Sequence, residues 1–221
     1  MKKILACVLV FALITALLSG CGNNNSKDSA PKGSEEVKVS PSPERGYEKG
    51  ILTETDFESS YLNLRFTVPE GFIMATQEDI NNMMNLGADV MGLDEKLIDY
   101  ANMVSVYEMM VSAPSGSPSV IVMVEKLALS NITIEQYFDA LKTQLSNLTE
   151  INYVINDDIT SVEIAGQSYK QLIVTTNVYG QNLTQSYMLR KSGDRMVGFI
   201  TTSTPDTEET LAILMNSFVE Y

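Results

Sequence analysis

Short runs in which apolar and polar residues alternate, separated by turn residues, dominate the chain from residue 50 onward. Alternation of this kind is typical of strands with one buried face. It is clearest in residues 61–68, where Leu62, Leu64, Phe66 and Val68 are the apolar positions. The pattern predicts strands over residues 51–55, 61–68, 104–111, 120–127, 153–164, 169–178, 183–191 and 195–202.

Apolar residues spaced three and four apart predict helices between these strands. Thr133-Ile134-Glu135-Gln136 has the form of a capping box and begins the clearest helix. Its apolar stripe consists of Ile134, Tyr137, Phe138, Leu141, Leu145 and Leu148. Thr76 and Asp79 predict the start of an earlier helix, and residues 94–101 predict a weaker one. Thr204-Pro205 predicts a helix start near the chain end, with an apolar stripe of Leu211, Leu214, Met215 and Phe218.

The order of elements is hairpin, helix, hairpin, helix, four-strand meander and helix. Hairpins and meanders make antiparallel sheets, and amphipathic helices bury their apolar stripes against a sheet face. The sequence therefore predicts the α+β class, an antiparallel sheet with helices packed on its faces, as a single domain over residues 47–221.

The N-terminus predicts a lipoprotein signal. Lys2 and Lys3 precede an apolar stretch, residues 4–18, that is too short to span a bilayer comfortably. Leu17-Leu18-Ser19-Gly20-Cys21 then has the form of a bacterial lipobox. We expect a signal peptide over residues 1–20 and lipidation of Cys21, which would anchor the protein to the outer face of the cell membrane. An ordinary cleaved secretory signal, with Cys21 as an incidental residue, is the alternative.

A segment with little to bury follows this cysteine. Residues 22–45 are rich in Asn, Ser, Pro, Gly and charged residues of both signs. This composition is typical of a flexible linker. Residues 21–46 are therefore predicted to be the lipidated cysteine and a tether between membrane and domain.

The residues that most enzymes use are scarce here. The chain has no histidine and two cysteines, Cys7 in the predicted signal peptide and Cys21. This excludes Ser-His-Asp and Cys-His catalysis and most zinc and copper sites. We therefore expect no catalytic residues, no metal ligands and no cofactor. The net charge of −13 argues against nucleic acid as a partner.

Methionine is concentrated in one part of the chain. Eight of the 12 methionines lie between Met74 and Met123. Flexible thioethers suit an adaptable apolar surface, so the candidate partner surface is Met83, Met84, Met109 and Met110. The alternatives are ordinary core packing under two helices and, with less support, a thioether copper(I) site.

Two charged clusters are also candidates for binding. Arg190, Lys191 and Arg195 surround a predicted turn and form a candidate basic patch for an anionic partner or lipid headgroups. Protection of an edge strand is the alternative explanation. Asn156-Asp157-Asp158 offers oxygen ligands for weak calcium binding but lacks the EF-hand pattern.

One segment resembles a known family. It reads Tyr61-Leu62-Asn63-Leu64-Arg65-Phe66-Thr67-Val68-Pro69-Glu70-Gly71-Phe72. This segment and the order of elements over residues 50–221 resemble the PsbP-like fold, which the extrinsic protein P of photosystem II shares with many small bacterial lipoproteins. Phe72 stands where tryptophan is frequent in that family. The resemblance implies a non-catalytic accessory or binding domain and carries no catalytic set over to this chain.

Together these observations predict a non-enzymatic interaction or accessory module of the cell envelope. Its expected contacts are the membrane, through lipidated Cys21, and an envelope protein. The alternative is a lipoprotein that binds a small ligand in an apolar pocket between sheet and helix. A deep pocket with convergent polar groups would favour the ligand, and an exposed apolar patch would favour the protein partner.

Overall fold

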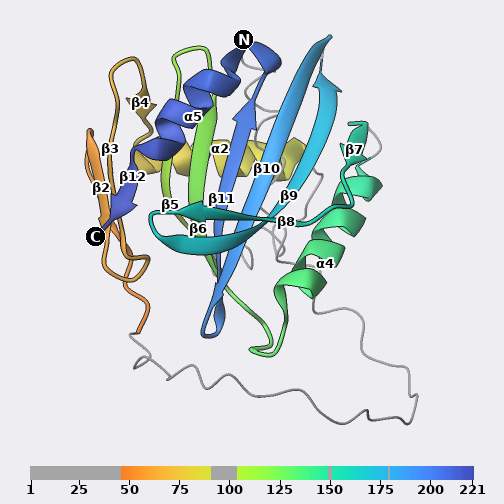
Figure 1. The fold of residues 1–221 in the computed structure, drawn as a ribbon, viewed down its shortest axis with the longest axis horizontal. Coiled ribbons are helices and arrows are strands. Elements are labelled where there is room, and N and C mark those ends of the chain that lie inside the picture. Colours follow the sequence, from red (N-terminus) through yellow and green to blue (C-terminus); the bar gives the residue numbers. More distant parts are fainter. Residues whose placement is uncertain (1–45, 91–103, 149–150, 179) are drawn as a thin grey trace.

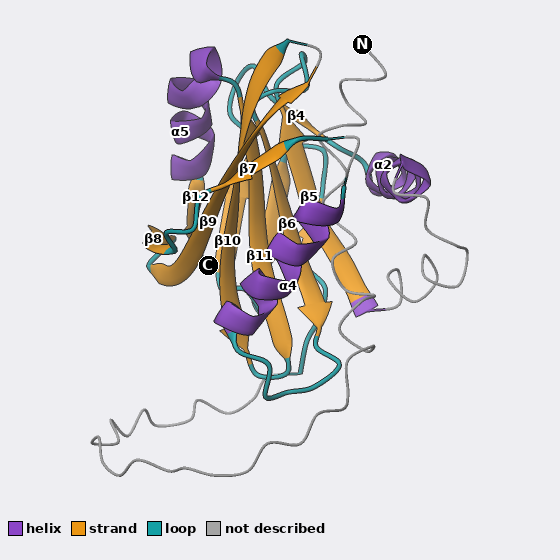
Figure 2. Cartoon of the chain, turned by 90° about the vertical axis from the view of Figure 1, so that its right-hand side faces the viewer, coloured by secondary structure: helices purple, strands orange, loops and turns teal. Residues whose placement is uncertain are grey.

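The computed structural model describes residues 46–90, 104–148, 151–178 and 180–221. The predicted signal peptide, Cys21, almost all of the predicted tether and the predicted helix over residues 94–101 lie outside the described residues. The described part has three layers, and Figure 2 shows the central sheet with helices on both sides.

The central layer is an antiparallel sheet of eight strands. Their order is β4-β5-β6-β11-β10-β9-β7, and β8 also pairs with β9. The strands are β4 (Ile73–Met74), β5 (Ser105–Ser112), β6 (Ser119–Lys126), β7 (Tyr153–Ile155), β8 (Thr160–Ile164), β9 (Gln167–Val178), β10 (Gln181–Ser192) and β11 (Arg195–Ser203). β6 and β11 are buried along almost their whole length, because both faces of the sheet are covered.

A second sheet of four short strands covers part of one face. Its order is β1 (Ile51–Leu52), β2 (Asp56–Ser59), β3 (Leu64–Thr67) and β12 (Phe218–Glu220). β12 pairs with β3 so that Phe218 lies opposite Phe66. This sheet therefore joins the end of the domain to its beginning (Figure 1).

The helices lie on both faces of the large sheet. They are α2 (Gln77–Val90), α4 (Ile134–Asn147) and α5 (Glu208–Asn216), with a 3-10 turn, η2 (Pro205–Thr207), directly before α5. Figure 2 shows α2 and α4 on one side of the sheet and α5 on the other, next to β12. Among the described residues, no helix is both long and apolar enough to cross a membrane.

The capping box predicted for α4 is present. The Thr133 hydroxyl accepts a hydrogen bond from the Gln136 backbone N–H at 3.2 Å, and the Gln136 side chain accepts one from the Thr133 N–H at 2.9 Å. Two backbone donors that no helical carbonyl reaches are thereby satisfied. The predicted stripe is buried at Tyr137, Phe138, Leu141 and Leu145.

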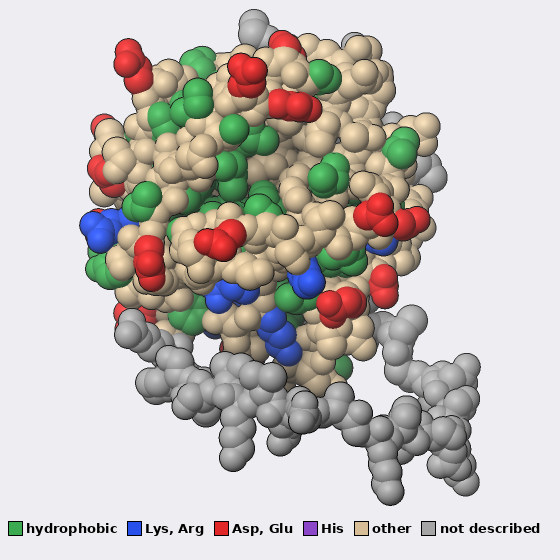
Figure 3. Space-filling view, in the orientation of Figure 1, with side chains coloured by type: hydrophobic (Ala, Val, Ile, Leu, Met, Phe, Trp, Pro, Cys, Tyr) green, Lys and Arg blue, Asp and Glu red, His purple; other side chains and the backbone are tan. Residues whose placement is uncertain are grey.

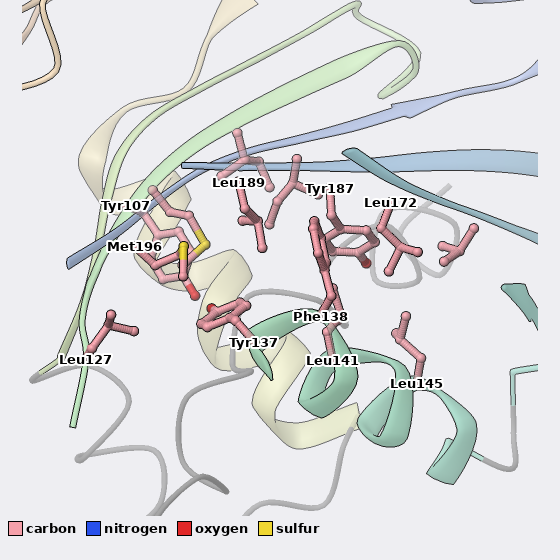
Figure 4. Packing of buried hydrophobic residues seen from close by; sticks show 14 of the residues in the cluster. Tyr107, Leu127, Tyr137, Phe138, Leu141, Leu145, Leu172, Tyr187, Leu189 and Met196 are labelled. Carbon is pink, nitrogen blue, oxygen red and sulfur yellow. The ribbon is translucent and has the colours of Figure 1, made fainter. Parts of the chain in front are cut away.

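Each face of the large sheet has its own hydrophobic core. Under α4, Tyr137, Phe138, Leu141 and Leu145 pack against the sheet residues Leu172, Tyr187, Leu189 and Met196 (Figure 4). On the other face Phe199, Phe218 and Leu214 pack with residues of the small sheet. The fold is therefore the predicted α+β arrangement of an antiparallel sheet with helices on its faces.

Three predicted elements differ from the structure. The expected hairpin of residues 51–55 and 61–68 is a three-strand unit, because residues 56–59 form β2 between them. The expected strand over residues 153–164 is divided into β7 and β8, which pair with different parts of β9. Phe218 is not on the C-terminal helix, since α5 ends at Asn216 and Phe218 begins β12.

Candidate functional site

A groove with a volume of about 430 Å³ opens on the face of the large sheet that carries α5. Its floor is formed by side chains of the central strands: Gln171, Ser186, Met188 and Thr201. One wall is α5 and the other is β8. Figure 3 shows hydrophobic side chains gathered in the hollow between these elements, with acidic side chains around it.

The helical wall comes from one face of α5. Glu208, Leu211, Ala212 and Met215 line the groove, at the spacing that places residues on one side of a helix. Leu214, on the adjacent side of the helix, is fully buried in the core. The helix is thereby fixed on the sheet while its adjacent face borders the groove.

The start of α5 is set by a local hydrogen-bond pattern. The Thr204 N–H donates to the Thr207 hydroxyl at 2.9 Å, and the Thr207 N–H donates to the Thr204 carbonyl at 2.9 Å. Pro205 occupies the first helical turn, where its missing N–H costs nothing. The sequence therefore specifies where the helical wall begins.

The opposite wall is the edge of a strand. Four consecutive residues, Val162 to Ala165, line the groove. Side chains alternate between the two faces of a strand, so four consecutive lining residues place the backbone edge of β8 at the groove. β8 pairs with β9 on its other side, and no strand within the described ranges pairs with the groove-facing edge.

A tight turn and one side chain hold this strand in place. Ala165 and Gly166 connect β8 to β9, with φ values of 47° and 72°, as a two-residue turn of type I′ requires. The Gln167 side chain donates a hydrogen bond of 2.7 Å to the Leu62 carbonyl. The tip of the β8–β9 hairpin is therefore tied to the small sheet.

The groove has acidic borders. Glu163 and Glu208, one on each wall, are both exposed and line it. The lining residues in the described part of the chain include no lysine or arginine. Asp206 and Glu209, both exposed, flank Glu208 at the start of α5. The surroundings therefore favour cationic over anionic groups.

The four methionines predicted as a partner surface do not form one. Met84 and Met110 are buried in the core under α4, and Met109 is buried in the core on the α5 side. Met83 is half-buried. Consecutive residues of β5 point to opposite faces of a sheet that is covered on both sides, so Met109 and Met110 cannot share an exposed surface. They are core residues.

The predicted basic patch is also divided. The Arg195 guanidinium lies 4.1 Å from the centre of the Tyr47 ring, and that of Arg190 lies 5.5 Å from the centre of the Tyr169 ring. The Lys191 ammonium donates a hydrogen bond of 2.5 Å to the Ser130 carbonyl, just before α4. Lys191 therefore lies on the face of the sheet opposite to the two arginines, and the three charges do not form one patch.

Two carboxylates are buried in the sheet. The Tyr137 hydroxyl donates a hydrogen bond of 2.5 Å to Glu125, and burial raises the pKa of Glu125 to about 7. Glu108 accepts hydrogen bonds from the Tyr47 hydroxyl at 2.7 Å and the Gly50 N–H at 2.8 Å. Burial also raises the pKa of Glu108. Neither carboxylate lines the groove.

The weak calcium candidate contains an ion pair. Asp157 accepts from the Lys142 ammonium at 3.1 Å, and the Asn156 side chain accepts from the Asp158 N–H at 3.1 Å. Over the described parts of the chain, no three His, Cys, Asp or Glu residues come together in an arrangement that could hold a metal ion.

Reasoning from sequence missed the groove because its residues come from six separate elements. One signal was present: the polar residues Ser186 and Thr201, which lie directly opposite each other on β10 and β11. The buried glutamates left a similar signal, since each interrupts an apolar run at Tyr107-Glu108-Met109 and Val124-Glu125.

No protein-family model and no curated protein matches the sequence. Among solved structures, the chain is similar to PsbP from the cyanobacterium Synechocystis, with 11% identity, coverage of 80% of this chain and 98% of that chain, and a TM-score of 0.45. It is also similar to LpqN, involved in cell envelope biogenesis of Mycobacterium tuberculosis, with 12% identity, coverage of 71% and 82%, and a TM-score of 0.42. The chain thus has low-identity structural similarity to PsbP. PsbP is the protein that gives its name to the fold that residues 61–72 resemble in sequence.

Proposed function

We propose that this protein is a lipid-anchored, extracytoplasmic interaction module that holds an envelope protein in the groove between α5 and β8, without catalysis of its own. The observation that carries the proposal is the groove itself. It combines apolar walls with a strand edge that pairs with no strand of the described residues, and such edges are ready templates for another chain. The predicted anchor at Cys21 would keep this groove close to the membrane.

The position of the groove favours a protein partner over a small ligand. Its borders include the exposed residues Glu163, Ala212 and Asn216, so it lies at the surface and not within either core. Pockets for small molecules bury most of the ligand surface. The volume of about 430 Å³ nevertheless lies in the range of ligand pockets, so a small apolar ligand is the second candidate.

A photo-reactive amino acid placed in the groove tests this proposal. At position 212 it would lie in the wall of the groove, whereas at position 213 it would replace Ile213, which is 59% exposed and does not line the groove. We expect irradiation of native membranes to give a discrete protein adduct from position 212 and none from position 213.

Two other outcomes have clear meanings. A small molecule retained in native mass spectrometry and displaced by Ala212→Trp, with no protein adduct, would favour the ligand-binding alternative. Equal cross-linking from both positions, or none from either without a retained ligand, would contradict a function for this groove.

A further inference from the structure

We infer that the partner segment binds as an additional β-strand along the groove-facing edge of β8, and that this segment carries both apolar and basic side chains. The inference rests on the proposed function of the groove and specifies its occupant. Three features carry it: the direction of the β8 backbone groups, the apolar walls and the acidic borders.

The β8–β9 turn determines which backbone groups face the groove. In this two-residue hairpin the two residues of the closing pair are Ile164 and Gln167. Each donates its backbone N–H to the carbonyl oxygen of the other. Bonded and non-bonded pairs then alternate along the ladder. Ile164 and Val162 therefore bond to β9, while Ser161 and Glu163 direct their N–H and C=O groups away from it, toward the groove.

The dimensions of the groove suit an extended chain. β8 has five residues, which corresponds to a length of about 16 Å at the usual strand rise. Val162 and Ile164 on the strand side, with Leu211 and Met215 on the helix side, supply apolar contacts. A strand added at this edge would direct alternate side chains toward the floor and toward solvent.

The charges select among possible segments. Glu163 lies on one wall of the groove and Glu208 on the other, and Asp206 and Glu209 are exposed near Glu208 in the chain. An acidic segment would be repelled by these carboxylates, whereas lysine or arginine on the solvent side would be attracted. The occupant best fitted to the groove is therefore an extended segment that alternates apolar and basic residues.

Selection of peptides by the full chain tests this inference. A display library of random twelve-residue peptides is panned against the full-length protein in detergent, with the Ala212→Trp variant used to remove peptides that bind elsewhere. We expect the selected peptides to alternate apolar residues with lysine or arginine. Their binding should weaken several-fold when the salt concentration is raised from low to physiological levels.

Substitutions then test two questions separately: whether the peptide binds as a strand, and whether it binds in the groove. Glu163→Pro removes the outward N–H without removing a bond to β9, so we expect at least a tenfold loss of affinity. Glu163→Gln keeps that N–H and removes only the charge, so the affinity for the peptide should fall only a few-fold. Ile213→Trp is the control for Ala212→Trp on the same helix and should bind like the wild type.

The peptide supplies a second measurement that does not depend on how well the proline variant folds. N-methylation at alternate positions of a selected peptide should abolish binding in one register and have no effect in the other. If Ala212→Trp abolishes binding but neither N-methylation nor Glu163→Pro does, strand addition is wrong and the groove function stands. If only acidic peptides are selected, the inference fails. If no peptide remains after removal of those that bind the Ala212→Trp variant, the inference also fails, and cross-linking from position 212 decides separately whether the groove has a partner.

Discussion

Gly50 is a residue with no room for a side chain. A Cβ atom there would lie 2.5 Å from Cε2 of Phe57 and 2.9 Å from the Glu58 carbonyl oxygen. The Gly50 N–H also donates to the buried Glu108 carboxylate. We expect Gly50→Ala to lower the free energy of unfolding by about 1–3 kcal/mol, measured by urea denaturation. Gly46→Ala is the control, because nothing lies within 4 Å of its added Cβ, and equal midpoints for the two variants would contradict the prediction.

Glu125 should make the stability of the protein depend on pH. Burial raises its pKa in the folded state to about 7 from an ordinary value of 4.5. Between these values the folded state binds more protons than the unfolded state, so the free energy of unfolding falls as pH rises. The size of the shift corresponds to a fall on the order of 3 kcal/mol from pH 4.5 to above pH 7.

Glu125→Gln keeps a hydrogen-bond acceptor for Tyr137 and cannot ionise. Denaturation at pH 5 and pH 8 should therefore show a smaller difference for this variant than for the wild type. The pKa of Glu108 is raised as well, so part of the pH dependence should remain. Exposed Glu163 is the control position, and Glu163→Gln should retain the wild-type pH dependence. A full pH dependence in Glu125→Gln would show that Glu125 is not its source.

At the scale of elements, the capping box of α4 gives a prediction for a single helix. Thr133→Ala removes the hydroxyl that accepts from the Gln136 N–H. Loss of such a cap costs about 1 kcal/mol, and thermal or chemical denaturation would measure it. Thr143→Ala, on an exposed position in the middle of the same helix, should change stability by less, because alanine is a better helix former. The prediction fails if the two variants are equally stable.

Elements with a strong internal pattern could be predicted from sequence. The stripe and capping box of α4 identify it without any knowledge of the rest of the chain. β10 and β11 are long, and the turn at residues 193–194 joins them directly, so their pairing is local. Local patterns were sufficient there because the interactions that form these elements lie within them or between sequence neighbours.

Elements that depend on distant partners could not be predicted. β12 has three residues, and Phe218 continues the spacing of the α5 stripe, so only its pairing with Phe66 shows it to be a strand. The interruption between β7 and β8 arises because the two segments pair with separate parts of β9. The groove depends on β12 and on the separation of β8 from β7, since β8 forms one wall and Phe218 of β12 lines the groove.

At the scale of the whole molecule, Cys21 is predicted to decide where the protein is found. Cys21→Ser removes the thiol that would carry the lipid, so the protein should be released from the membrane fraction or remain unprocessed. Cell fractionation with immunoblotting would measure this. Cys7→Ser lies in the predicted signal peptide and should behave like the wild type. A mature Cys21→Ser protein that stays in the membrane fraction would contradict lipid anchoring.

The pairing of β12 with β3 has a consequence for the folding pathway. The Asn63 side chain donates to Glu220 at 3.0 Å, although the two residues are 157 positions apart in sequence. Closing so long a loop is entropically costly, and folds rich in such contacts form slowly. In vectorial export, which the predicted signal peptide would direct, the early strands would emerge long before their last partner. Their apolar face, including Phe57 and Phe66, then stays open to aggregation or chaperone capture until the final strand arrives.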